Sequence, residues 1–230
     1  MPSLDEPFSA EILDFNLKRM SPEQLAGHGI PAELGEYVGD YRQYPPRIAL
    51  ALPEGVRWYR EGNPWFYKDA LNVSHPHDDC LILSGSGMSA HRYQEGALET
   101  DPENIALLEV AQQRIRDYLG VGKWVLGIRF GGQLAMHSVG GRVGRLPGNT
   151  TEAGWLPHTL TQDGHQDEVF SALPHVFYAP HFHNDFVLAL PSPGTDIHSE
   201  MGSTRVKRAR VLATRPVSYT NLTLPTIYSV

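Results

Sequence analysis

The sequence predicts an α/β fold built on a mainly parallel β-sheet, and two apolar runs with a helix between them indicate it. Residues 79–83 and 124–128 are short apolar segments that each lead into a glycine-containing loop, and the first of them has the pattern of a buried parallel strand. Residues 101–119 carry apolar side chains at helical spacing. A strand, a helix and a strand in this order form a βαβ unit, which binds ligands at the carboxyl ends of its strands. We therefore expect the loop 84–87 and the turn after the second strand to face one another.

The first 78 residues give weaker signals that partly compete. Residues 10–15 fit a first strand with a helix starting near Ser21, and residues 47–52 equally fit a strand that follows two prolines. The aromatic-rich stretch 58–67 is expected to pack over the sheet or to line a partner surface. No internal repeat and no second domain are evident, so we expect one domain over residues 1–215, of which the part up to residue 78 is poorly assigned.

The helix between the two strands has signals at both ends. Asp101 is a candidate N-cap, Pro102 fits the first helical position, and Gly120 follows the last apolar position. The predicted buried face consists of Leu108, Ala111, Ile115 and Leu119. Cys80, in the preceding strand, lies among apolar residues, where a thiol behaves as a small hydrophobe. We therefore expect Cys80 to be structural and not a nucleophile.

Composition narrows the class of protein. With 230 residues, of which 41% are hydrophobic, the chain is long enough for one substantial core. Its single cysteine allows no internal disulfide, and no stretch resembles a signal peptide or a membrane span. A formal net charge of -7 argues against a nucleic-acid partner. We expect a cytoplasmic protein without nucleic-acid or membrane partners, and we expect the basic run 205–210 to be a solvated strand or loop edge.

Residues 124–133 have the form of a nucleophile elbow, in which a strand turns sharply into a helix. In such an elbow one residue takes a strained conformation, small neighbours let the backbone bend, and the following N–H groups can face an oxyanion. Arg129 stands at the nucleophile's position. A guanidinium stays protonated and offers no lone pair to a carbonyl carbon, so it cannot attack one. The turn therefore has the architecture of a catalytic site without its nucleophile.

The elbow and three further segments, in the same order, resemble class I glutamine amidotransferases of the GMP-synthase-like branch. Residues 127–133 resemble the family's G-I-C-x-G-H-Q elbow, with Arg129 in place of the cysteine. The other matches are residues 79–87 with D-x-x-I-L-S-G-G-P, residues 140–143 with G-G-x-V, and residues 183–191 with H-x-D-x-V-x-x-L-P. Four ordered motifs make chance similarity a poor explanation.

The resemblance, which covers residues 79–214, implies a three-layer flavodoxin-like sandwich with a mainly parallel central sheet. In the family a cysteine attacks the side-chain amide of glutamine, and the released ammonia feeds a synthase partner. The resemblance assigns six residues to the substrate pocket: Gly85, Ser86, Phe130, Gln133, His183 and Asp185. Gly85 and Ser86 belong to the loop whose N–H groups help to form the oxyanion hole. The resemblance implies no cofactor and no metal.

The chain also departs from the family near its end. The family's catalytic histidine and glutamate lie in an H-P-E motif after a V-L-A step, and no such motif follows residues 211–213. Residues 216–230 instead resemble the translated read-through of a sequencing adapter, so we expect a non-native tail on a truncated chain. The alternative is an ordinary C-terminal strand, because alternating threonine and leucine suit a pleat.

Three functions fit these observations. The one we favour is a pseudoenzyme that lacks glutaminase activity and binds or regulates: Arg129, at a helix N-terminus, would clamp glutamine or a small anionic metabolite, or the flank of the pocket would dock a synthase subunit. The first alternative is an active amidotransferase subunit, if Arg129 is a sequence error and an H-P-E motif lies beyond the recorded end. The second is a metal-dependent hydrolase using His181, His183 and Asp185, whose side chains would share one face of an extended segment. The sequence names neither the acceptor substrate nor the oligomeric state.

Overall fold

The computed structural model describes residues 9–13, 15, 57–61, 78–86, 88–96, 102–199 and 201–214. These residues fall into two units, each with its own strands and buried side chains. The first unit combines residues 1–88 with residues 124–131, and the second combines residues 89–123 with residues 132–230. The expectation of one domain over residues 1–215 stays a prediction.

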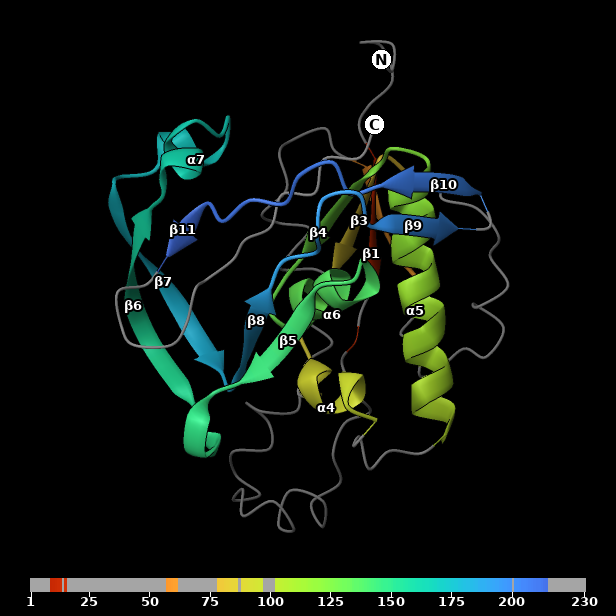
Figure 1. The fold of residues 1–230 in the computed structure, drawn as a ribbon, viewed down its shortest axis with the longest axis horizontal. Coiled ribbons are helices and arrows are strands. Elements are labelled where there is room, and N and C mark those ends of the chain that lie inside the picture. The colour runs from red at the N-terminus through yellow and green to blue at the C-terminus, as the bar shows by residue number, and fades with distance from the viewer. Residues whose placement is uncertain are drawn as a thin grey trace. The chain divides into compact units, whose positions relative to one another are not determined.

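Four parallel strands form the sheet of the first unit: β1 (Ser9–Leu13), β2 (Arg57–Glu61), β3 (Cys80–Leu83) and β4 (Trp124–Gly127). Their order is β2-β1-β3-β4, so β1 and β3 are the inner strands. Figure 1 labels β1, β3 and β4 of this sheet. The predicted α/β fold with a parallel sheet is confirmed. The strands predicted in the apolar runs 79–83 and 124–128 and at residues 10–15 are confirmed as β3, β4 and β1. Strand β2 falls in the aromatic stretch for which no strand is predicted.

Some sequence-based expectations cannot be compared with the structure. The strand proposed at residues 47–52, the helix proposed from Ser21 and the adapter-like tail at residues 216–230 all lie outside the described residues. The same holds for Asp101, the candidate N-cap, and for Gly87 in the loop after β3.

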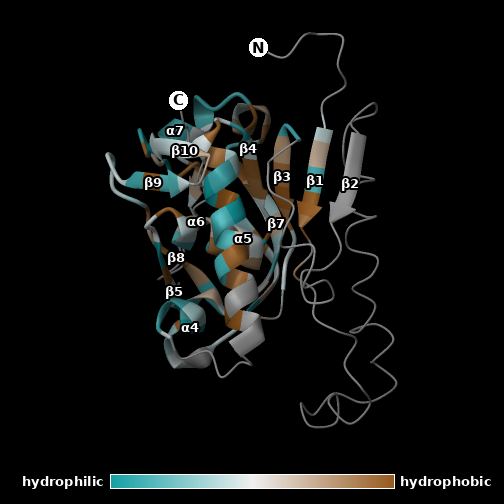
Figure 2. Ribbon diagram, turned by 90° about the vertical axis from the view of Figure 1, so that its right-hand side faces the viewer, coloured by the Kyte–Doolittle hydropathy of each residue, from teal (hydrophilic) through white to brown (hydrophobic). Residues whose placement is uncertain are grey.

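The inner strands of the first unit are buried and mostly apolar, although β1 also buries the charged Glu11. All four residues of β3 and four of the five residues of β1 are buried, and both strands are mostly brown in Figure 2. One core cluster joins Ala10 and Ile12 of β1 with Cys80 and Ile82 of β3, and Ile128 packs against it. A continuous apolar run is typical of parallel strands that are covered on both sides. The prediction that Cys80 is a core residue is confirmed.

Helices α4 (Ala90–Gln94), α5 (Pro102–Gly120) and α7 (Gln162–His165) belong to the second unit, and α6 (Phe130–Ser138) passes into it from the first. Helix α5 starts at the predicted proline and ends one residue later than expected. Its predicted apolar face is buried, with Tyr118 added to it. In Figure 2 the helix is accordingly brown along one side and teal along another.

The strands of the second unit pair in an antiparallel way, which the sequence does not predict. They form three groups: β5 (Arg142–Arg145) with β8 (Asp185–Ala189), β6 (Glu152–Leu160) with β7 (Val176–His183) and β11 (Ala213–Thr214), and β9 (Asp196–Ser199) with β10 (Gly202–Arg205). Short 3-10 helices occupy Pro147–Asn149 and Phe170–Ala172. Helix α5 packs against β9 and β10 (Figure 1).

The basic run 205–210 lies where the sequence predicts, at the solvated end of a strand and in the loop that follows. The exposed Arg205 is the last residue of β10 and forms an ion pair with Asp196 of β9. Arg208 pairs with Asp163 of α7 at 2.7 Å. Exposed pairs of this kind contribute about 0.2–1 kcal/mol each to stability. Two of the arginines therefore have carboxylate partners within the unit.

Candidate functional site

The elbow between β4 and α6 holds a residue other than glycine in a left-handed backbone conformation. Arg129 has a φ of 54° and is the one residue other than glycine with a positive φ among the described residues. A left-handed conformation costs an L-residue about 1–2 kcal/mol, so it persists only where the surrounding structure enforces it. The predicted elbow geometry is therefore present, with the arginine at its strained position.

Close contact with the end of β3 explains why the residue two places after the arginine is glycine. A Cβ atom at Gly131 would lie 2.6 Å from both the Cβ and the carbonyl oxygen of Leu83, far inside van der Waals contact. The N–H of Gly131 donates to the carbonyl of Ile128 at 3.0 Å and closes the turn. The N–H of Ile128 donates to the carbonyl of Leu83 at 2.9 Å. The elbow is thus fixed directly on the carboxyl end of β3.

The loop after β3 is held by the buried Ser84. Its N–H donates to the carbonyl of Leu13 at 3.0 Å, and its hydroxyl accepts a 2.9 Å hydrogen bond from the N–H of Phe15. The same hydroxyl donates to the carbonyl of Gly85 at 3.1 Å. A Cβ atom at Gly85 would lie 3.4 Å from Cδ of Arg129, so the arginine stem passes over this glycine. The prediction that the loop and the elbow face one another is confirmed.

Phe130 and Ser86, the other two predicted pocket residues of the first unit, have partners within that unit. The ring of Phe130 is buried and packs edge-on against Phe15, with centroids 5.5 Å apart. Its side chain is therefore a core contact, and only its backbone is available to a ligand. The hydroxyl of Ser86 accepts a 3.1 Å hydrogen bond from the N–H of Met88. The binding roles of both residues stay predictions.

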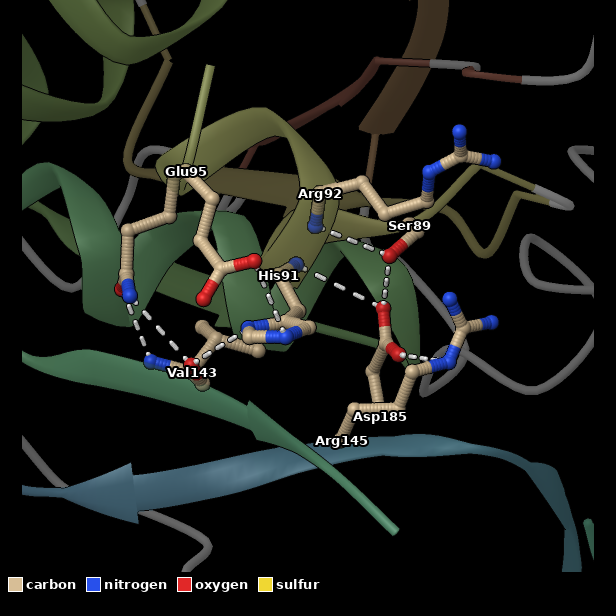
Figure 3. A network of polar contacts seen from close by, with 8 residues as sticks. Ser89, His91, Arg92, Glu95, Val143, Arg145 and Asp185 are labelled. Carbon is tan, nitrogen blue, oxygen red and sulfur yellow. Dashed lines mark hydrogen bonds and ion pairs between the residues drawn. The ribbon is translucent and has the colours of Figure 1, made fainter. Parts of the chain in front are cut away.

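In the second unit, Asp185 is a buried carboxylate at the start of β8 with several partners (Figure 3). Its Oδ2 accepts a hydrogen bond from the hydroxyl of Ser89, the N-cap of α4, and a longer one of 3.4 Å from the N–H of His91. Its Oδ1 lies 3.6 Å from Nε of Arg145. Hydrogen bonds and an opposite charge offset the desolvation that burial imposes on a carboxylate. Asp185 thus links β8 to α4 and β5.

Two side chains next to this network hold the backbone of neighbouring strands. The amide of Gln133 in α6 donates to the carbonyl of Asp185 at 2.8 Å, which makes this predicted pocket residue a support for β8. Gln94 bonds both backbone groups of Val143, accepting from its N–H at 2.9 Å and donating to its carbonyl at 3.3 Å. His91 contacts the same carbonyl through Nδ1 at 3.2 Å.

His183 lies in a different group of side chains from Asp185, which corrects the proposed metal set of His181, His183 and Asp185. His183 ends β7, which pairs with β6, whereas Asp185 begins β8, which pairs with β5. Nε2 of His183 lies 2.7 Å from Nδ1 of His181 and 3.6 Å from a carboxylate oxygen of Glu152. The group that could hold a metal ion among the described residues is Glu152, His181 and His183. The change of strand pairing at Asn184 separates the two motif residues.

Several contacts of the site are absent from the sequence-based predictions. His91 and Arg145 carry no motif signal, and Asp185, which they contact together with Ser89, lies far away in the chain. Ser89 alone had a detectable signal, because a serine before a helical segment is a typical N-cap. Cys80 is correctly predicted as inert: burial raises the pKa of its thiol to about 12, so no thiolate forms near neutral pH.

Comparison with known proteins identifies the fold and not the family. No protein-family model matches the sequence, and no curated protein matches it. The crystal structure of the protein SMU.1228c superposes with a TM-score of 0.56 at 16% identity, over 96% of this chain and 76% of that chain. A proposed GMP synthase component from Thermoplasma acidophilum has a TM-score of 0.55 at 14% identity, over 97% of this chain and 84% of that one. A glutamine amidotransferase from Thermotoga maritima has a TM-score of 0.54 at 18% identity, over 94% and 70%.

These likenesses establish the class of structure to which the chain belongs. Its neighbours are class I glutamine amidotransferase-like, and the predicted flavodoxin-like α/β fold is confirmed. No helix in the described part of the chain is long and apolar enough to cross a membrane.

Proposed function

We propose that the chain is an amidotransferase-like binding protein in which Arg129 replaces the nucleophile and holds a small anion. The observation that carries this proposal is the positive φ of Arg129. An arginine gains nothing from a conformation that costs about 1–2 kcal/mol unless the turn around it is kept for another reason. A retained elbow with a changed central residue fits a pocket that has exchanged hydrolysis for binding.

Hydrolysis by the route of the family needs a thiolate, and the described residues offer none. The guanidinium of Arg129 has no lone pair with which to form a thioester-like intermediate. Cys80 cannot substitute, because it is buried in β3 and its pKa is raised to about 12, mainly by that burial. The described residues therefore supply the turn of a catalytic elbow and not its nucleophile.

The arginine is suited to a carboxylate or a phosphate. It is exposed, it immediately precedes α6, and it lies over the backbone of Gly85. A guanidinium can bond two oxygens of such an anion at once, and a helix N-terminus adds a favourable field. Glutamine, glutamate or a phosphorylated metabolite carries the required group. Glutamine itself would then bind without being cleaved.

An anion titration tests this proposal directly. Phosphate, L-glutamate and L-glutamine are titrated calorimetrically into the purified chain, and glutamate release from glutamine is measured in parallel. We expect saturable binding without glutamate release, and loss of binding in Arg129→Gln. The matched control is Arg142→Gln, which removes an equal charge from an exposed position of β5. Binding that Arg129→Gln leaves unchanged would overturn the proposal.

The competing function is an active glutamine-hydrolysing protein whose sequence carries an error at residue 129. The strained turn supports this alternative too, because the same geometry serves a nucleophilic cysteine. Under it, Arg129→Cys in a chain extended to the native stop codon would release glutamate from glutamine. Under the function we favour, the native codon at position 129 encodes arginine. Glutamate release by Arg129→Cys would then show that only the nucleophile is lost, and continued inactivity would show that the pocket has diverged further.

We further propose that the partner of this chain is a synthase. The support for this partner is the resemblance of the elbow region and the fold shared with a proposed GMP synthase component. Synthase polypeptides co-purifying with the tagged chain from its native source would support the partnership. A chain that elutes alone at physiological concentration would contradict it.

A further inference from the structure

One face of the β6–β7 hairpin gathers three histidines and a glutamate. Residues paired across two strands point to the same face, and Glu152 is paired with His183 and Gly154 with His181. His158 lies further along β6 on the same face, because positions 152 and 158 are both even-numbered and side chains alternate between the two faces of a strand. The four side chains come from only two strands, which are drawn side by side in Figure 1.

The ligand atoms of this group are close enough to share one ion. His183 Nε2 and His181 Nδ1 are 2.7 Å apart, and they lie 3.6 Å and 3.9 Å from the same oxygen of Glu152. Tetrahedral coordination with bonds of about 2.0–2.1 Å places ligand atoms about 3.3 Å apart. The two distances to Glu152 are near that value, and the histidine pair needs to open by about 0.6 Å.

A fourth side chain orients the innermost ligand. Nε2 of His181 lies 2.7 Å from Nε2 of the fully buried His158. A histidine that binds a metal through one nitrogen commonly has its other nitrogen engaged by a neighbouring group, which fixes the ring and its tautomer. His158 is itself held, since its ring is stacked 5.3 Å from Phe177 and 4.8 Å from His181. The arrangement leaves Nδ1 of His181 directed to Glu152 and His183.

The residue opposite His181 has no side chain to compete for this space. Gly154 has a φ of 111°, a conformation that favours glycine, and a Cβ atom there would meet no atom within 4 Å. Solvent also reaches the group, because 16% of the Glu152 side chain and 18% of the His183 side chain are exposed. An ion could therefore reach the group and fit beside the strands.

We propose that Glu152, His181 and His183 bind one divalent ion of the zinc class, with His158 as a positioning residue. Two imidazole nitrogens and one carboxylate oxygen favour Zn²⁺, Ni²⁺ or Cu²⁺ over Mg²⁺ and Ca²⁺, which prefer oxygen ligands. Three protein ligands leave at least one position open to water or another ligand. The proposal does not depend on the function proposed for Arg129.

Metal titration of the whole chain tests this assignment. The purified protein is stripped with a chelator and titrated with Co²⁺, whose visible absorption bands report coordination, and Zn²⁺ is then added as competitor. We expect one Co²⁺ per chain, displaced by Zn²⁺, and a rise in Tm with bound Zn²⁺. Glu152→Gln and His183→Ala should abolish the Co²⁺ bands. His158→Phe should weaken binding about 10–100-fold while the bands persist.

The matched control is a second histidine pair in the same unit. His165 and His175 stack in an exposed position with ring nitrogens 2.9 Å apart and no part in the proposed set. The double variant His165→Ala with His175→Ala should bind Co²⁺ like the parent. Circular dichroism and Tm of each metal-free variant establish that it is folded. Absence of stoichiometric binding in the parent, undiminished binding in folded His183→Ala, or equal loss in the control pair would each overturn the proposal.

Discussion

Replacing Gly131 by alanine tests the packing that creates the elbow. The added Cβ would lie 2.6 Å from the Cβ and the carbonyl oxygen of Leu83 and 2.8 Å from its carbonyl carbon. Ordinary contacts between such atoms are about 3.5–4.0 Å, so the overlap is about 1 Å and falls partly on backbone that cannot rotate away. Forcing atoms into a packed site costs about 1–3 kcal/mol, and the backbone contact favours the upper end.

The higher helix propensity of alanine partly offsets this destabilisation. Alanine is about 1 kcal/mol better than glycine inside a helix, and residue 131 is the second residue of α6. The net destabilisation is therefore about 2 kcal/mol, which corresponds to a Tm about 4–8 °C lower for a chain of this length. Differential scanning calorimetry measures the shift. Gly85→Ala is the control, because its Cβ would meet atoms no closer than 3.4 Å. An unchanged Tm for Gly131→Ala would refute the reasoning.

Three further predictions use the same unfolding measurements. Arg129→Gly should raise the free energy of unfolding by about 0.5–1 kcal/mol. The variant relieves about 1–2 kcal/mol of backbone strain, and the greater entropy of its unfolded chain costs about 0.4–1 kcal/mol. A lower urea midpoint would show that Arg129 is not strained. Burial raises the pKa of the Cys80 thiol to about 12, so its contribution to stability is present below pH 9 and is lost as the pH rises towards 12. Cys80→Ala should therefore reduce the fall of Tm between pH 9 and pH 12. An unaltered dependence of Tm on pH would disprove the assignment. Asp185→Asn should cost about 1–3 kcal/mol, because it removes the charge that faces Arg145 and weakens the acceptor for Ser89; a midpoint equal to the parent's would show that the network contributes nothing.

The parts of the fold that depend on local sequence are the parts that could be predicted. The two apolar runs and the spacing of Leu108, Ala111 and Ile115 predict strands β3 and β4 and helix α5, because each pattern lies within one continuous stretch of sequence. Burial follows the prediction in β3 and α5, whereas β4 exposes Trp124 and Leu126. The elbow is predictable for a similar reason: a strand, a glycine-flanked turn and a helix start are adjacent in sequence. The structure adds only the positive φ that places Arg129 at its apex.

The grouping of site residues depends on distant contacts and could not be read from spacing. His183 and Asp185 are two residues apart, which on a continuous strand would place them on one face. The change of pairing partner between β7 and β8 sends His183 to Glu152 and Asp185 to Ser89. Alternation along a strand defines its two faces, but it does not say which neighbouring strand a residue will meet. The sequence therefore does not predict Glu152 as the third member of the group with His181 and His183.

The proposed binding function requires a genuine arginine at the nucleophile's position of the elbow. Sequencing of the native gene from the codon for Gly127 through its stop codon decides whether that arginine is real. We expect an arginine codon at position 129. A cysteine codon there, followed by an H-P-E triplet beyond residue 215, would contradict it and make the protein a glutamine-hydrolysing enzyme.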